Sequence, residues 1–174
     1  MKIRRLCCVA AVSCLVFVLP QALIADPLDN WHLRYTVTLS HNLGMHLFYG
    51  GGFFVATGAN GQIATSPDGV TWTERVSGVT ADLSAGAYGN GTFVIFGDGG
   101  LVLTSPDGVN WTPKYLDPTI IGNAVIYANG LFACACNDGR IVTSPDGFSW
   151  AVKNTGAPSF LSGITYGNGL FVAV

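Results

Sequence analysis

Short apolar runs alternate along the chain with turns rich in glycine, asparagine and aspartate, and the pattern returns every 39 residues. The runs at 53–57, 93–96, 131–136 and 170–174 lack the apolar/polar alternation of a half-buried strand. Runs of this length between turns are typical of strands buried on both faces. No segment beyond the N-terminal apolar stretch shows an apolar period of 3.6 residues, so helices are not expected there. The pattern predicts an all-β chain.

Two kinds of turn punctuate each copy of the pattern. Asn-Gly at 90–91, 129–130 and 168–169, with Gly-Gly at 51–52, is the pair favoured in two-residue hairpins, because a type I′ turn needs positive φ at both central residues. A Ser-Pro-Asp-Gly turn follows the third apolar run, where proline presets φ, aspartate accepts local backbone hydrogen bonds and glycine takes positive φ. Each copy therefore predicts four short strands, the last of which begins at a tryptophan.

Four strands in a repeat of about 40 residues are typical of a blade of a β-propeller. The fold class that we predict is an all-β propeller of four-stranded antiparallel blades, with about three and a half blades present within 26–174. We expect units at about 43–76, 82–115 and 121–154, an incomplete unit at 160–174 and an orphan outer strand at 29–38. We expect this chain to be the N-terminal part of a longer propeller of about six to eight blades.

The first 25 residues have the pattern of a secretory signal peptide. A basic segment at 1–5 precedes an apolar segment at 6–19, and a small residue, Ala25, suits cleavage. Three alternatives are less favoured. The segment could be a membrane anchor, although a transmembrane helix needs about 20 apolar residues. It could also carry a twin-arginine signal at Arg4-Arg5 or a lipoprotein site at Cys14. We therefore expect an exported protein (extracellular, at the cell surface or periplasmic) without membrane insertion after cleavage.

Composition narrows the classes of partner. Hydrophobic residues make up 49% of the chain and charged residues 10%. A disordered protein would combine low hydrophobicity with high net charge, so we expect a folded protein. A net charge of -2 offers no basic footprint for nucleic acid. Beyond the signal, only Cys134 and Cys136 remain. They are too few for a metal site, so we expect two small residues packed within a strand.

The segment Ser-Pro-Asp-Gly-x-x-Trp occurs three times at the same spacing. It resembles the Asp-box, or bacterial neuraminidase repeat, of sialidase-type β-propellers, whose pattern is Ser/Thr-x-Asp-x-Gly-x-x-Trp. Here glycine follows aspartate directly, so each copy is one residue shorter between Asp and Trp. The matching residues are Ser66, Asp68, Gly69 and Trp72; Ser105, Asp107, Gly108 and Trp111; and Ser144, Asp146, Gly147 and Trp150. The resemblance covers roughly 29–174 and implies that these residues serve the fold.

The sialidase-like enzymes that share this repeat are expected to use three arginines, a Tyr/Glu pair and an acidic acid/base. In this chain the repeats contain only Arg75 and Arg140, and Glu74 is the only glutamate. His32, His41 and His46 lie in the N-terminal section without a clustered acid or cysteine, so we expect surface or capping roles for them. No catalytic, cofactor-binding or metal-binding residue is assigned.

The favoured hypothesis is an exported, non-catalytic scaffold that binds a protein or glycan ligand, because the blades are nearly uniform. One alternative is the N-terminal fragment of a sialidase-like or other glycoside hydrolase whose catalytic residues lie elsewhere. A second alternative is a protein assembly or chaperone factor built on the same repeats. Neither nucleic acid nor a cofactor is an expected partner.

Overall fold

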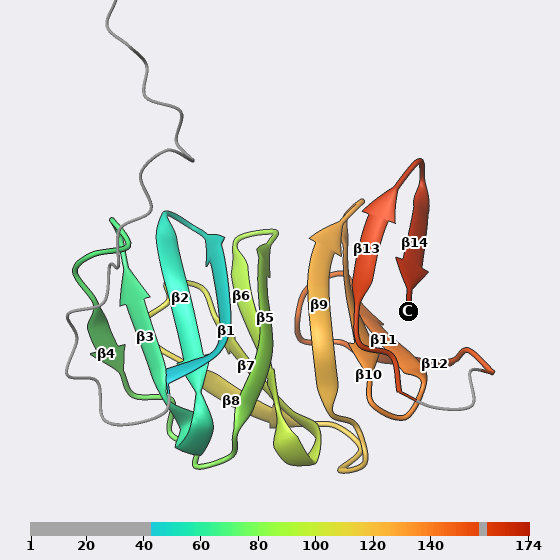
Figure 1. Cartoon of the computed structure of the whole chain (residues 1–174), viewed down its shortest axis with the longest axis horizontal. Coiled ribbons are helices and arrows are strands. Elements are labelled where there is room, and N and C mark those ends of the chain that lie inside the picture. The colour runs from blue at the N-terminus through green and yellow to red at the C-terminus, as the bar shows by residue number, and fades with distance from the viewer. Residues whose placement is uncertain (1–42, 157–159) are drawn as a thin grey trace, which may run out of the picture. The chain divides into compact units, whose positions relative to one another are not determined.

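The computed structural model describes residues 43–156 and 160–174. The expected signal peptide at 1–25, the orphan strand at 29–38, His32 and His41 lie outside these residues. Within them the chain forms three four-stranded antiparallel sheets and one two-stranded sheet (Figure 1). The prediction of an all-β chain built from four-stranded antiparallel units is therefore confirmed.

Each sheet is a meander whose strands pair in chain order, and we call the sheets blades 1 to 4. Blade 1 consists of β1 (Leu43–Gly50), β2 (Phe53–Gly58), β3 (Ile63–Ser66) and β4 (Thr73–Arg75). Blade 2 consists of β5 (Leu83–Gly89), β6 (Thr92–Gly97), β7 (Leu101–Ser105) and β8 (Thr112–Tyr115). Blade 3 consists of β9 (Gly122–Ala128), β10 (Leu131–Cys136), β11 (Arg140–Ser144) and β12 (Ala151–Asn154). Blade 4 contains β13 (Ile164–Gly167) and β14 (Leu170–Ala173).

The hairpins between the first and second strands follow from their Asn-Gly pairs. Asn90 and Gly91 have φ values of 47° and 74°, so both central residues of the turn between β5 and β6 lie in the left-handed region. This is the backbone of a type I′ turn, whose twist matches that of the flanking strands. The same signs of φ recur at the turns before β10 and β14.

Two details differ from the sequence-based expectations. The fourth strand begins one residue after the tryptophan, because the ladder starts where Thr112 pairs with Thr104 and the preceding residues still belong to the aspartate turn. Single 3₁₀ turns, η1 (Ala59–Gly61) and η2 (Asp98–Gly100), join the second and third strands of blades 1 and 2. A helix of one turn is too short to produce an apolar period.

The core lies between neighbouring blades. The side chains of β6 are all buried, and they alternate between two clusters because successive residues of a strand point to opposite faces. Phe93 and Ile95 pack with residues of blade 1, whereas Val94 and Phe96 pack with residues of blade 3. The non-alternating apolar run therefore covers both faces of the sheet.

Cys134 and Cys136 are free thiols buried in the cluster between blades 2 and 3, as expected for small packed residues. Burial raises the pKa of the Cys134 thiol, so this group is held in its neutral form. Among the residues that the structure describes, no helix has the length and apolar character needed to cross a membrane.

Candidate functional site

The three aspartate turns share one hydrogen-bond pattern. In blade 2 the hydroxyl of Ser105 donates to the Asp107 carboxylate at 3.0 Å and accepts from the amide of Gly108 at 2.8 Å. The same carboxylate accepts from the amides of Val109 at 2.9 Å and Asn110 at 2.8 Å. Ser66 with Asp68, and Ser144 with Asp146, repeat these bonds in the other two turns.

These hydrogen bonds lower the pKa values of the turn aspartates and so stabilise their ionised form. The amides of Thr71 and Val70 lower the pKa of Asp68 to about 2. The amide of Asn110 lowers the pKa of Asp107 most, and the amide of Ser149 does the same for Asp146. A carboxylate committed to backbone amides and stabilised in its ionised form is a poor proton donor at neutral pH. The geometry gives these aspartates a role in holding the turn.

The glycine of each turn completes the pattern. Gly69, Gly108 and Gly147 have φ values of 72°, 71° and 82°, a region that L side chains rarely adopt. A Cβ atom on Gly108 would lie 3.6 Å from the Phe93 ring and 3.9 Å from Thr65, a residue of blade 1. The aspartate turn of blade 2 therefore lies next to blade 1.

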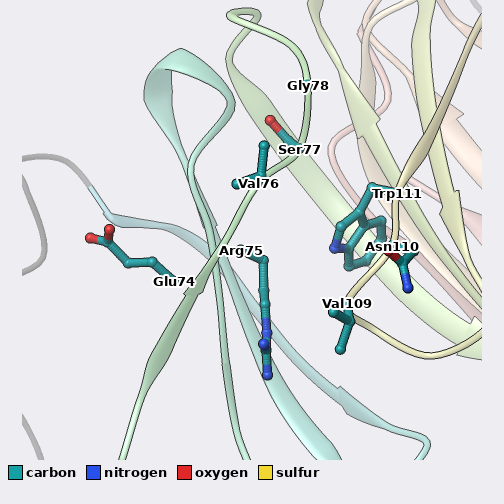
Figure 2. A pocket seen from close by; sticks show the side chains of 8 residues that line it. All are labelled: Glu74, Arg75, Val76, Ser77, Gly78, Val109, Asn110 and Trp111. Carbon is teal, nitrogen blue, oxygen red and sulfur yellow. The ribbon is translucent and has the colours of Figure 1, made fainter.

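An open cleft of about 550 Å³ lies between the end of blade 1 and the aspartate turn of blade 2 (Figure 2). One wall is the segment from Glu74 to Gly78, which contains the end of β4, and the other is Val109, Asn110 and Trp111. Val76 is 87% exposed and Val109 is 41% exposed. The cleft thus offers two aliphatic side chains and an indole ring to a ligand.

Arg75 is the cation of this cleft. Its Nε donates to the hydroxyl of Thr65 at 2.8 Å, and Thr65 is 2% exposed. The ion pairs found within the described ranges all involve Arg140, so none of them engages Arg75. Glu74 precedes Arg75 in the strand and points to the other side of β4 (Figure 2). The guanidinium is anchored through one nitrogen, while its two terminal amino groups pair with no carboxylate of the described residues.

The equivalent position between blades 2 and 3 is arranged differently. Lys114 lies 39 residues after Arg75, and its Nζ donates to the carbonyl of Phe148 at 2.5 Å. Phe148 is the repeat counterpart of Val109, so this bond links β8 to the aspartate turn of the next blade. The corresponding cation of blade 1 bonds within its own blade instead, through Thr65.

Trp111 and Trp150 also differ. The indole nitrogen of Trp150 donates to the carbonyl of Gly147 at 2.9 Å, and its ring lies edge-on to Phe96 with centroids 5.0 Å apart. The buried indole nitrogen of Trp111 makes no hydrogen bond to the described part of the chain. The ring of Trp111 lines the cleft, and its centroid lies 6.1 Å from the centroid of the Phe93 ring.

The repeat pattern of the sequence does not reveal this cleft. The sequence feature that could have pointed to the cleft is a basic residue at the same position of three units, namely Arg75, Lys114 and Lys153. The other arginine of the repeats, Arg140, is paired with Asp138 and with Asp117, the latter at 3.0 Å, and joins the segment after β8 to β11. It holds a loop against a strand.

Of the three histidines, His46 lies within the described residues. Burial lowers the pKa of His46, which favours a neutral imidazole in β1. In the part of the chain that the structure describes, no three side chains of the His, Cys, Asp and Glu types come together as metal ligands.

Comparisons with known proteins identify the fold. No family model matches the chain, and no curated protein matches it in sequence. YCF48 from Cyanidioschyzon merolae matches with a TM-score of 0.58 and 17% identity, over 76% of this chain and 49% of that one. A structure described as YCF48 bound to D1 peptide matches with a TM-score of 0.53 and 21% identity, over 64% of this chain and 39% of that one.

A computationally designed protein, Ika4, matches with a TM-score of 0.57 and 15% identity, over 73% of this chain and 81% of that one. The chain spans less than half the length of either YCF48 structure. At these identities the comparisons show the fold alone. They confirm that the chain is a partial β-propeller of four-stranded blades.

Proposed function

We propose that this chain is a non-catalytic propeller scaffold that binds an extended segment of a protein partner in the cleft between blades 1 and 2. The observation that carries the proposal is the contrast between the two interblade positions. One is bridged by Lys114 and Phe148, whereas the other is open and lined by Val76, Val109 and Trp111. Exposed aliphatic and aromatic side chains beside a strand are typical of peptide grooves.

The comparisons support a peptide as the class of ligand. One similar propeller is described as bound to a D1 peptide. An assembly or chaperone role, which requires recognition of a protein chain, is one form of this function. The three Ser-Pro-Asp-Gly-x-x-Trp turns support membership of the Asp-box type of repeat, and the N-terminal pattern supports export. The partial match to longer propellers supports further blades in the whole protein.

The proposal is tested by selecting random dodecapeptides displayed on phage against the immobilised full chain. Selected peptides are then measured by fluorescence anisotropy against the wild type, Val76→Gln and Tyr115→Gln. Tyr115 is the exposed counterpart of Val76 in the next blade, so its variant is a matched control.

We expect Val76→Gln to weaken binding about tenfold, since it replaces an aliphatic contact with a polar one. Tyr115→Gln should leave binding unchanged. The proposal is wrong if no peptide is selected, or if the selected peptides bind Val76→Gln as tightly as the wild type.

A further inference from the structure

We infer that the cleft recognises a carboxylate, an aspartate or glutamate side chain of the bound peptide, through the guanidinium of Arg75. This inference rests on the proposed function and adds the chemical class of the segment that the scaffold selects.

The anchoring of Arg75 favours this ligand. The bond from Nε to Thr65 fixes the plane of the guanidinium against a buried residue of β3. The two terminal amino groups that remain form the planar fork that binds a carboxylate with two parallel hydrogen bonds. Because the side chain is already held in place, less conformational entropy is lost when the ligand binds.

Charge complementarity selects an acidic partner. Lys114, the counterpart of Arg75, is bonded to a backbone carbonyl of the next blade, whereas no ion pair and no bond across the cleft engages Arg75 in the described ranges. Glu74 also lines the cleft, but its side chain points away from Arg75 (Figure 2), and no ion pair in the described ranges joins the two. The cleft therefore presents a guanidinium that makes no ion pair with the described residues, beside the apolar side chains of Val76 and Val109.

The surroundings favour a peptide over a free anion. β4 is an outer strand that pairs with β3 alone among the described elements, so an extended chain can add to its other edge. Side chains on one face of such a chain would alternate into the cleft. One acidic residue would meet Arg75, and apolar neighbours would contact Val76 and Val109.

The test uses the peptides selected on the wild-type chain. We expect them to share an acidic position, and replacement of that residue by its amide should weaken binding to the wild type at least tenfold. The Arg75→Gln variant should bind the acidic peptide about tenfold more weakly than the wild type does. Replacement of the acidic residue by its amide should then have little further effect on binding to this variant. This double-mutant cycle assigns the coupling to the pair of residues.

Four controls separate the outcomes. Lys114→Gln should bind the peptides like the wild type, and Arg75→Lys should recover only part of the affinity, because an ammonium lacks the fork. Circular dichroism and thermal unfolding of Arg75→Gln verify its fold. N-acetylneuraminic acid, a carboxylate sugar, should not displace the peptide, and displacement would overturn the choice of a peptide.

The two proposals fail in distinguishable ways. If Val76→Gln weakens binding but Arg75→Gln does not, the peptide cleft stands and the carboxylate inference is wrong. If neither variant weakens binding, both are wrong. The inference would also be overturned if replacing the peptide's acidic residue by its amide weakened binding to the wild type and to Arg75→Gln by the same factor.

Discussion

Gly89 of blade 2 lies directly against the ring of Tyr127 of blade 3: a Cβ atom on Gly89 would lie 1.9 Å from Cγ of that ring. Gly50 of blade 1 is equally close to Tyr88 of blade 2: a Cβ atom on Gly50 would lie 2.0 Å from the Cβ atom of Tyr88. Neither glycine has a left-handed φ, so the need for glycine comes from the closeness of the blades. The third unit carries Ala128 at this position, so this close approach belongs to the first two interfaces.

Gly89→Ala should therefore lower the free energy of unfolding by about 1–3 kcal/mol, the usual cost of overpacking. Gly167 occupies the same position of the repeat, and a Cβ atom there would meet nothing within 4 Å. Gly167→Ala should change stability by less than about 0.5 kcal/mol. Urea denaturation followed by circular dichroism measures both. Equal effects of the two substitutions would contradict the interblade contact.

Ser105→Ala should destabilise the aspartate turn of blade 2. Ser105 is fully buried, and its hydroxyl accepts from the amide of Gly108 and donates to Asp107. Removal of the hydroxyl leaves the Gly108 amide without that acceptor, which costs about 1–3 kcal/mol when the site is buried. Urea denaturation measures the loss. A variant as stable as the wild type would show that another group or water replaces the hydroxyl.

The two tryptophans of blades 2 and 3 should respond differently to the loss of the indole nitrogen. Trp150→Phe removes the bond to the Gly147 carbonyl, whereas Trp111→Phe removes a donor that makes no hydrogen bond within the described chain. Trp150→Phe should therefore cost about 1 kcal/mol more than Trp111→Phe. Thermal unfolding of the two variants makes the comparison, and equal losses would contradict it.

The fold could be predicted from sequence because its determinants are local and repeated. Asn90-Gly91 sets a turn through the φ preferences of two residues, and Asp107 bonds to amides two and three positions away. The start of β8 could not be placed to the residue, because it depends on where Thr112 meets Thr104 across the ladder.

The cleft could not be predicted because a repeat pattern describes what the units share, and the cleft exists where two units differ. Arg75 and Lys114 are both basic and occupy the same position. Their roles separate only in three dimensions, since Lys114 reaches Phe148, 34 positions away, and Arg75 bonds to Thr65.

Acid should destabilise this protein through its turn aspartates. The folded-state pKa of Asp68 is lowered to about 2, mainly by the amide of Thr71, and those of Asp107 and Asp146 are lowered by equivalent amides. The unfolded chain therefore binds protons first, near the ordinary aspartate pKa of about 3.9. The stabilisation is present above that pH and is lost as pH falls toward about 2.

The triple variant Asp68→Asn, Asp107→Asn, Asp146→Asn tests this origin of the acid sensitivity. The amide oxygens can still accept from the turn backbone but do not titrate, so the variant should be less stable at neutral pH and lose less stability between about pH 4 and pH 2. Urea denaturation at a series of pH values gives the slope for each protein. If the variant loses stability as steeply as the wild type over that range, the acid-sensitive groups lie elsewhere, with Asp117 beside Thr119 and Arg140 as the next carboxylate to replace.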